Sequence, residues 1–382
     1  MRRMVMESKG RVAKATHVGI PADLTEEEHG RAAFAGPVSH LYRTIPATAW
    51  IDVDGPLRPA AFDLNLLSPP DADDPEGLST AVLYNDDLRV RISRRTASMP
   101  YALRNADGDE IAFVHHGAGV LQTDYGPLPY EAGDYLVIPK GTVHRWVPDG
   151  SESFLLVIES TAAVTLPDFG LMGRHAVVDP KVLATPEPWT EPPADWTGDG
   201  NGRWWRVRVK RLQAWTTFTY PHNPFTAVGW AGDLAPYRLH VRDIRPVISP
   251  RYHLPPSVHT TFRCGRFDIA TFVPRPFETD PESLRVPFFH ANVDNDEVIF
   301  YSRGDFFSRK GIGEGWLTLH PQGAPHGPQP GAAERAAAKE TADEIAVMIE
   351  CQAPLSITDE AKAAEDPAYT TSWARGMGLV DG

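Results

Sequence analysis

The chain has 382 residues, more than one hydrophobic core usually supports, so two domains or one duplicated domain are expected. Its net charge is −13, from 37 Lys and Arg against 50 Asp and Glu residues spread along the sequence, which argues against nucleic acid or an anionic membrane as partner. Two cysteines, Cys264 and Cys351, are too few for a disulfide framework and lack a zinc-binding spacing. They are expected to be buried thiols in a reducing compartment.

The N-terminal segment MRRMVMESKGRVAKATHVG is basic but lacks the apolar stretch of about 7–15 residues that a secretory signal needs. No stretch of the chain reaches the roughly 18 consecutive apolar residues of a membrane span. A cytoplasmic protein is therefore expected.

Short apolar segments separated by turn residues make up most of the chain. YLVIP, FLLVIES, RFDIATFVP, EVIFYS and IAVMIE are typical of β-strands, and the Pro and Gly residues between them favour an all-β sandwich or barrel. A proline- and tryptophan-rich stretch, residues 184–205, is expected to connect two domains. Strong helix formers predict two short helices, over residues 331–345 and 358–366.

Two sequence motifs occur in the same order in both halves of the chain. The first pairs NADGDEIAFVHHG (residues 105–117) with NVDNDEVIFYSRG (residues 292–304). The second pairs GDYLVIPKGTVH (residues 133–144) with GWLTLHPQGAPH (residues 315–326). Identical Asn, Asp, Glu, Gly, Pro and His residues fall on one another in these alignments. A duplicated structural unit follows.

A strand that opens with an acidic residue, a glycine turn, and a strand ending in G-D-Y-x-x-I-P-x-G-x-x-H resemble the double motif of the cupin fold. The resemblance implies an all-β bicupin with a few short helices, each half a double-stranded β-helix (jelly roll) that holds one metal or small ligand. Residues 1–170 would form a degenerate cupin-like domain with an N-terminal arm. Residues 171–245 would form a connecting segment packed on the core, and residues 246–382 a catalytic cupin with C-terminal helices.

The second copy of the repeat contains a set of side chains suited to bind a metal. His290 precedes Glu297 by seven residues, and His326 follows Glu297 by twenty-nine. Two imidazoles and one carboxylate leave three coordination positions open, which is typical of non-haem Fe(II) sites. The first copy has Leu103 at the position of the first histidine and thus lacks a third ligand. We expect chemistry in the second barrel and a structural role for the first.

The C-terminal half resembles homogentisate 1,2-dioxygenase beyond the general cupin pattern. VPFFHANVDNDEVIFYSRG (residues 286–304) is similar to that family's Pro-aromatic-aromatic-His segment, with one more residue between the histidine and the glutamate. LHPQGAPHGPQP (residues 319–330) is similar to its second-motif segment. Residues 237–260 and 166–180 resemble two further segments, and the resemblance covers most of residues 40–355.

The resemblance implies an Fe(II)-dependent, extradiol-type dioxygenase that cleaves the ring of a para-dihydroxylated aromatic, such as homogentisate or a related hydroquinone or gentisate-like compound. Its partners would be that substrate and O₂, and the chain would form a homo-oligomer, a trimer or a hexamer. His290, Glu297 and His326 would bind Fe(II).

The same resemblance implies roles for four further residues. His253 would be the active-site base, and His320 a second catalytic histidine or a substrate contact, on one strand with His326 and facing the same side. Phe289 and Phe306 would line the substrate pocket. Where the family has a tyrosine that contacts the substrate, this chain has Phe306, which removes a hydroxyl donor and leaves homogentisate and its relatives equally open as substrates. A substrate carboxylate would need a cation, for which the candidates are Arg303, Arg309 and Lys310.

Two alternatives remain at this point. The chain could be another metal-dependent cupin enzyme that uses the same three ligands, such as an isomerase or a dioxygenase acting on a diketone. It could also be a cupin without catalytic activity that binds a small molecule as a sensor or store.

Overall fold

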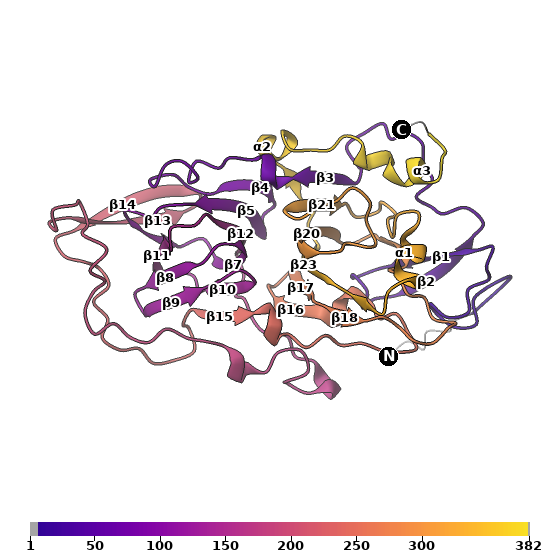
Figure 1. Cartoon of the computed structure of the whole chain (residues 1–382), viewed down its shortest axis with the longest axis horizontal. Coiled ribbons are helices and arrows are strands. Elements are labelled where there is room, and N and C mark those ends of the chain that lie inside the picture. The colour runs from indigo at the N-terminus through magenta and orange to yellow at the C-terminus, as the bar shows by residue number, and fades with distance from the viewer. Residues whose placement is uncertain (1–6, 381–382) are drawn as a thin grey trace.

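The computed structural model describes residues 7–380, which form two β-barrels side by side along the long axis of the molecule (Figure 1). The first six residues, part of the expected N-terminal arm, and the last two lie outside the described residues. The all-β jelly-roll architecture expected from the motifs is confirmed. The helices are short: α1 (Ala332–Ala337), α2 (Asp359–Lys362) and α3 (Ser372–Gly376), with single 3-10 turns at Leu64–Leu66, Gly170–Met172, Pro180–Val182, Val241–Asp243, Pro256–His259 and Tyr369–Thr371.

The first barrel consists of two facing sheets. Its strands are β4 (Thr80–Tyr84), β5 (Leu88–Arg95), β6 (Ala102–Asn105), β7 (Asp109–His116), β8 (Gly119–Thr123), β9 (Gly126–Tyr130), β10 (Asp134–Ile138), β11 (Val143–Pro148), β12 (Ser153–Ser160), β13 (Trp205–Arg211), β14 (Ala214–Tyr220), β15 (Tyr237–His240) and β24 (Ser356–Ile357). One sheet has the order β15-β10-β7-β12-β5-β4-β24, and the other β14-β13-β6-β11-β8-β9.

The second barrel carries the second copy of the repeat. Its strands are β1 (Thr25–Gly30), β2 (Val38–Arg43), β3 (Ala60–Asp63), β16 (Thr260–Arg263), β17 (Phe267–Phe272), β18 (Arg275–Pro276), β19 (Phe289–Asn292), β20 (Asp296–Gly304), β21 (Trp316–His320), β22 (Thr341–Ala342) and β23 (Glu344–Cys351). The main sheet has the order β16-β17-β23-β20-β21-β3, and a smaller sheet β19-β1-β2 faces it, with the pair β18-β22 at one side.

The two copies of the repeat share a backbone conformation as well as residues. Gly117 follows β7 with φ +89°, and Gly304 ends β20 with φ +104°. A Cβ at Gly117 would lie 2.4 Å from the carbonyl oxygen of Glu152, and one at Gly304 would lie 2.2 Å from that of Asp343. Only glycine fits either position, so the shared glycine reflects a shared turn.

Strand pairing crosses the expected domain boundaries. The N-terminal hairpin β1-β2 belongs to the second barrel, where β1 runs parallel to β19 with Glu28 opposite His290. The expected connecting segment, residues 171–245, supplies the hairpin β13-β14 to the first barrel, where β13 runs parallel to β6 with Arg208 opposite Leu103. The two hairpins therefore occupy equivalent places, one in each barrel, and Figure 1 shows them at opposite ends of the molecule.

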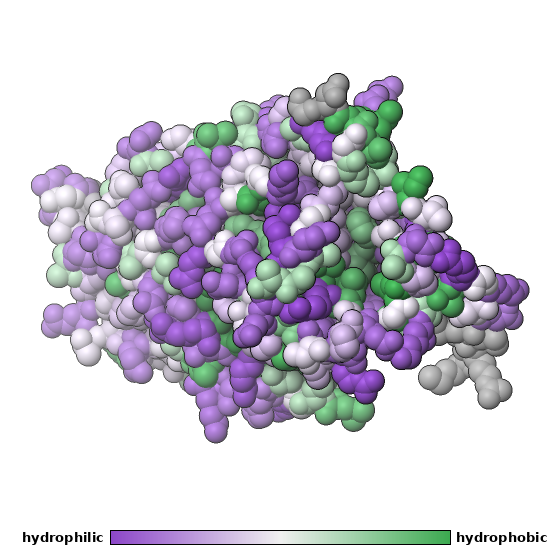
Figure 2. Space-filling model, turned by 45° about the vertical axis from the view of Figure 1, so that its right-hand side comes forward, coloured by the Kyte–Doolittle hydropathy of each residue, from purple (hydrophilic) through white to green (hydrophobic). Residues whose placement is uncertain are grey.

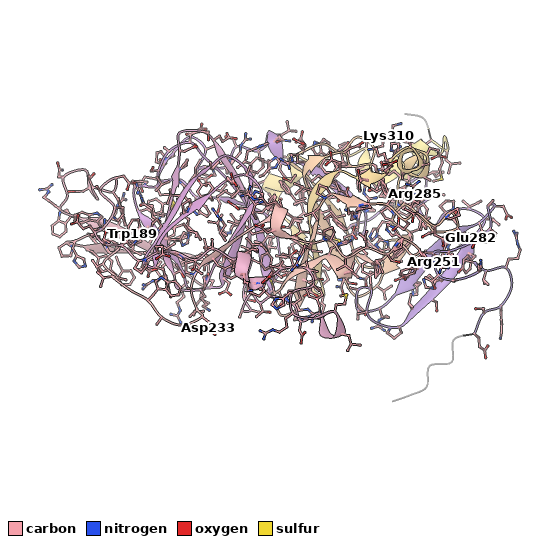
Figure 3. All side chains as sticks on the ribbon, turned by 60° about the horizontal axis from the view of Figure 1, so that its bottom comes forward. Trp189, Asp233, Arg251, Glu282, Arg285 and Lys310 are labelled. Carbon is pink, nitrogen blue, oxygen red and sulfur yellow. The ribbon has the colours of Figure 1, made fainter. Side chains whose placement is uncertain are left out.

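The connecting segment packs through its tryptophans, as its composition indicates. Trp189 and Trp196 lie on Phe225 in a cluster that packs on strands β6, β11 and β13 of the first barrel, and Trp189 Nε1 donates to the carbonyl oxygen of Thr123 at 2.7 Å. Figure 3 labels Trp189 at the end of the molecule opposite to the β1-β2 hairpin. The segment is thus part of the first barrel.

One hydrophobic core runs through both barrels. Tyr135 of the first barrel packs on Phe262 of the second with ring centroids 5.2 Å apart, and Phe113 faces Phe300 at 6.3 Å. The Tyr135 hydroxyl lies 2.9 Å from Thr271 Oγ1. Because these buried contacts join the barrels, we expect them to unfold together.

The C-terminal helices differ from their expected ranges. The helix expected over residues 331–345 is limited to α1, because Glu344–Cys351 forms β23 between β17 and β20 in the barrel. The helix expected over residues 358–366 is the shorter α2, capped by the Thr358 side chain. Helix α3 has no clear helical pattern in the sequence and is held by the fully buried Trp373.

The surface matches the acidic, polar composition. Figure 2 shows a face that is mostly hydrophilic, with hydrophobic residues in small separate groups. Within residues 7–380, no helix combines the length and the apolar character needed to cross a membrane. Cys264 and Cys351 are buried free thiols, and burial raises the pKa of both.

A buried histidine at the interface between the barrels is expected to make the stability of the protein depend on pH. His115 Nδ1 lies 3.1 Å from Ser302 Oγ across the interface, and burial, with the nearby His116 and Arg94, lowers the pKa of His115 to about 3. An unfolded histidine titrates near its ordinary pKa of about 6.5, so between these two values the unfolded chain binds the extra proton. Stability from this residue is present above pH 6.5 and is lost as the pH falls towards 3.

We expect His115→Asn to reduce the slope of unfolding free energy against pH by up to about 1.4 kcal/mol per pH unit between pH 6 and 4. Urea denaturation across this range measures the slope. His222→Asn is the control, because His222 is exposed and is not among the groups that lower the pKa of His115. Equal slopes in the wild type and His115→Asn would contradict the assignment.

Candidate metal centre and adjoining cavity

Three side chains of the second barrel converge on one point. His290 lies on β19, Glu297 near the start of β20, and His326 on the loop that follows β21. His290 Nε2 is 3.5 Å from Glu297 Oε2, and His326 Nε2 is 3.4 Å from Glu297 Oε1. Mutual backbone hydrogen bonds of 2.8 Å between His290 and His326 hold the loop against the strand. The sequence-predicted ligand set is therefore brought together in space.

The imidazoles are oriented to present a lone pair. His290 Nδ1 donates to the carbonyl oxygen of Phe288 and His326 Nδ1 to that of Ala324, both at 3.0 Å. Each Nε2 is then unprotonated and, among the described residues, is buried with no hydrogen-bond partner. Two unpartnered nitrogens beside a carboxylate fit a metal ion, which would occupy the space between them.

The charges in the site also suit a cation. Burial alone would raise the pKa of Glu297, but its contacts with His326, His290 and His320 hold that pKa well below its ordinary value. Burial lowers the pKa of His326, with a further contribution from His290. At neutral pH the site thus holds an anionic carboxylate and a neutral imidazole, the forms in which these groups bind metals.

His320 lies behind the metal ligands and outside the substrate cavity. Its Nδ1 is 2.7 Å from Glu297 Oε1 and its Nε2 is 2.8 Å from the Tyr369 hydroxyl. The side chain is fully buried, and burial lowers its pKa to about 3. A turn separates β21 from His326, so the two histidines do not share a strand and instead stack with ring centroids 4.4 Å apart. His320 does not line the cavity, and its geometry indicates that it positions Glu297.

A cavity of about 90 Å³ opens beside the three ligands. His290 and Glu297 form its inner end, and most of its walls are apolar. The other lining residues that bear on the chemistry are His253, His259, Phe272, Arg275, Glu278, Phe288, Ile299, Tyr301, Arg309 and Met348. The cavity is therefore bounded by apolar and aromatic side chains, with a few polar groups at defined positions.

His253 lies in this cavity, as expected for the base. Its Nδ1 is 2.8 Å from Glu278 Oε1, so the carboxylate accepts the Nδ1 proton and leaves Nε2 as the basic nitrogen. Glu278 was not predicted, because it follows His253 by twenty-five residues without any shared motif. The His253 imidazole is thus oriented by the Glu278 carboxylate.

The two phenylalanines expected at the substrate lie elsewhere. Phe289 points to the opposite face of β19 from His290 and packs towards Tyr369 and Trp373, while its neighbour Phe288 lines the cavity. Phe306 is buried behind the cavity wall, with its ring 4.9 Å from that of Tyr301. Tyr301, which lines the cavity, thus presents a hydroxyl in the region where Phe306 has none.

The three candidate cations differ in burial. Arg303 and Lys310 are exposed, and Figure 3 shows Lys310 near the edge of the molecule. Arg309 is buried and lines the cavity, where its Nε donates to the Tyr301 hydroxyl at 3.2 Å and its Nη1 to the Gly327 carbonyl oxygen at 2.6 Å. Its guanidinium forms no ion pair with a carboxylate of the described residues. It is therefore a buried cation beside the cavity that lacks a protein anion.

Two polar residues of the cavity were missed from the sequence. His259 is buried, and burial lowers its pKa to about 3, so it is a neutral imidazole. Arg275 donates to Glu344 at 2.9 Å and lies over the ring of Phe272. His259 could have been noticed because it follows His253, the predicted base, by six residues. No motif around Arg275 indicates a role for it.

The first barrel retains two of the three positions. Glu110 and His144 lie 3.7 Å apart, and Leu103 occupies the place of the first histidine. A pocket of about 50 Å³ beside them contains Lys210, which forms a buried ion pair with Glu159. A lysine ammonium thus supplies the positive charge in this barrel.

The equivalent carboxyl in the second barrel has no cation. Glu350 stands opposite Glu297 on β23, as Glu159 stands opposite Glu110 on β12. Burial, and then the charge of Glu297, raise the pKa of Glu350 well above its ordinary value, which favours its uncharged form. Glu297 is then the carboxylate that the second barrel offers to a metal.

Comparison with known proteins adds to the geometry. The family model described as homogentisate 1,2-dioxygenase N-terminal matches residues 78–241, and the one described as homogentisate 1,2-dioxygenase C-terminal matches residues 253–377. A protein of Saccharolobus solfataricus that carries the provisional name of a dioxygenase is 32% identical, over 96% of this chain and 98% of its own.

Homogentisate 1,2-dioxygenase of Pseudomonas savastanoi pv. phaseolicola is 26% identical over 76% of this chain and 65% of its own length. The chain thus spans about two thirds of that relative. Among solved structures, protein Ylba from E. coli is aligned over 80% of this chain and 95% of its own, with 7% identity and a TM-score of 0.37.

The two barrels offer a matched test of the metal site. We expect Glu297→Gln to lower the affinity for a divalent metal by at least about 10–100-fold, because the only anionic ligand is lost. The equivalent change Glu110→Gln in the first barrel should leave the metal content unchanged. Metal analysis of both variants after anaerobic loading with Fe(II) checks this expectation. Equal metal loss in the two variants would contradict the assignment to the second barrel.

Proposed function

We propose a reaction from one premise: the chain belongs to the homogentisate 1,2-dioxygenase family and is a dioxygenase. In the proposed reaction it opens the ring of a para-dihydroxylated aromatic with O₂, and His290, Glu297 and His326 hold Fe(II). The main support is the pair of buried, unpartnered imidazole nitrogens that face Glu297 at the inner end of the cavity. Two imidazoles and one carboxylate leave positions for a substrate oxygen and for O₂.

Fe(II) bound there would acidify a coordinated ring hydroxyl and hold O₂ next to the ring. His253 would accept the proton of that hydroxyl at Nε2, since its Nδ1 proton is held by Glu278. The same nitrogen would return a proton to the ring-opened product. His320 would keep Glu297 in place through its 2.7 Å contact, with its own ring held by Tyr369.

The cavity walls favour an aromatic ring, because Phe288, Phe272 and Met348 provide apolar surface. The Tyr301 hydroxyl would supply the hydrogen bond that Phe306 cannot make to a second ring hydroxyl.

The first two features of the proposed substrate are an aromatic ring and its hydroxyl groups. Arg309 indicates a third feature, a carboxylate. A buried guanidinium without an anionic partner carries a desolvation cost that a carboxylate ligand would offset. Two of its donors are used, to Tyr301 and Gly327, and the remaining N–H groups are free to bind an anion. An arylacetate or a benzoate with two para hydroxyls, such as homogentisate or gentisate, meets all three features.

We expect rapid O₂ uptake by the Fe(II)-loaded protein with homogentisate, gentisate or a simple hydroquinone, measured with an oxygen electrode. His290→Ala should abolish it through loss of iron. His253→Asn should retain its iron and lose about 10²–10⁴-fold in kcat, as expected when a general base is removed. Stoichiometric iron without uptake on any of these compounds would refute the ring-cleaving proposal.

The role of Arg309 is tested by substrate choice. Arg309→Met should raise KM for substrates with a carboxylate about 10–100-fold, since a charged hydrogen bond is lost, and change KM for unsubstituted hydroquinone little. Lys310→Met, on the adjacent exposed residue, should alter neither value. Steady-state kinetics on the two substrate types gives the comparison. An equal rise in both KM values would mean that Arg309 acts only on the structure of the site.

A further inference from the structure

We propose that the N-terminal arm carries a second metal site, formed by His17, Glu28 and His40, which binds a divalent ion of the Zn²⁺ type. The site is independent of the proposed reaction. Its ligands come from the β1-β2 hairpin and from the segment before it, which pack against the catalytic barrel. One geometric sign of the catalytic site is repeated here: a buried histidine nitrogen, His17 Nε2, has no hydrogen-bond partner among the described residues.

The donors lie at metal-binding separations. Glu28 Oε2 is 3.7 Å from His17 Nε2 and 3.2 Å from His40 Nε2. Ligands about 2.0–2.2 Å from a tetrahedral Zn²⁺ stand roughly 3.4 Å from one another. The corresponding separations in the catalytic site are 3.5 and 3.4 Å. His17, His40 and Glu26 also form a group whose donor atoms lie within 4.8 Å of one another, so both imidazoles and the carboxylates of this cluster are close enough together to surround one metal ion.

His17 is oriented as a metal ligand. Its Nδ1 lies 2.5 Å from Glu26 Oε1, and the other oxygen of Glu26 accepts a 2.7 Å hydrogen bond from the Tyr42 hydroxyl. Glu26 thus takes the Nδ1 proton, an arrangement that fixes many metal-binding histidines, and leaves the Nε2 lone pair directed at Glu28. His17 is fully buried, and its Nε2 is one of the buried nitrogens without a hydrogen-bond partner in residues 7–380.

A cluster of ion pairs without metal is the competing interpretation. Hydrogen bonding to Glu28 raises the pKa of His40, and a protonated His40 would form an ion pair with that carboxylate. That arrangement leaves His17 Nε2 unpaired in a buried place, 3.7 Å from Glu28 Oε2. A divalent cation would bind this nitrogen and balance the charges of Glu26 and Glu28 together. The metal therefore accounts for one observation that the ion pairs leave unexplained.

The site would connect the arm to the substrate cavity. The His17 ring stacks on Phe288 with centroids 4.0 Å apart, and Phe288 lines the catalytic cavity. Lys14 forms an ion pair with Glu282 at 2.6 Å next to this cluster, at the end of the molecule where Figure 3 labels Glu282 and Arg251. A metal ion on His17 would thus fix one wall of the cavity and fasten the arm to the barrel.

The test uses the full chain with the catalytic ligands removed, His290→Ala with His326→Ala. This parent variant is stripped with a chelator, incubated with Zn²⁺, desalted and analysed for zinc and for thermal denaturation. We expect about one zinc per chain and a higher Tm with zinc than without. Adding His17→Gln or His40→Asn should remove both the bound zinc and the rise in Tm. His29 is an exposed histidine next to Glu28 on β1. Adding His29→Gln should change neither the bound zinc nor the rise in Tm.

Circular dichroism of each variant shows whether it is folded before zinc is added. Loss of zinc in folded His40→Asn, whose side chain is 10% exposed, supports the site even where His17→Gln disturbs the core. A parent variant that binds no zinc would overturn the proposal. So would zinc binding that survives His17→Gln and His40→Asn, or that is lost equally in His29→Gln.

Discussion

One buried carboxylate among three imidazoles is the interaction on which the catalytic half of this protein depends. Glu297 cannot remain charged at 4% exposure without its neighbours, and His290, His320 and His326 come from three different backbone segments. Each imidazole is oriented at its other nitrogen, two by backbone carbonyl oxygens and one by the Tyr369 hydroxyl. The pairing of strands, the loop after β21 and the C-terminal helices all serve to hold this arrangement.

The two barrels show how one duplicated framework can be structural or catalytic. In the first, Lys210 from β13 neutralises Glu159, and a leucine fills the place of the third ligand. In the second, the residue at the corresponding place on the parallel hairpin strand is Gly30, and a raised pKa favours the uncharged form of Glu350 instead. The second barrel lacks the lysine and has one histidine more, and the two differences together leave a negative site that an external metal can fill.

The features that could be predicted from the sequence are those that depend on particular residues at fixed spacings. The duplicated motifs predicted the jelly-roll fold, and they predicted that His290, Glu297 and His326 would converge. The hairpin β1-β2 escaped prediction, because TEEEHG and VSHLYR have no alternation of apolar residues and gain their partner only in three dimensions. Phe288 lines the cavity and Phe289 does not, because neighbouring residues of a strand point to opposite faces and the sequence does not fix which of the two faces inward. Of the three candidate cations, only Arg309 is buried beside the cavity. The sequence could not identify it, because no sequence pattern indicates that a single arginine is buried.

The place of the N-terminal hairpin bears on how the chain is made. Arg31, just after β1, pairs with Asp294, which is 263 residues away in the chain, and β1 itself adds to β19. During synthesis the hairpin therefore leaves the ribosome long before its partner strand exists, while the first barrel is still being translated. Until then, the backbone of β1 and the acidic and histidine side chains of the hairpin stay unpaired. Pairing between segments so far apart in the chain is slow to form. The catalytic barrel can close only after nearly the whole protein has emerged, so folding of the active half is tied to completion of the chain.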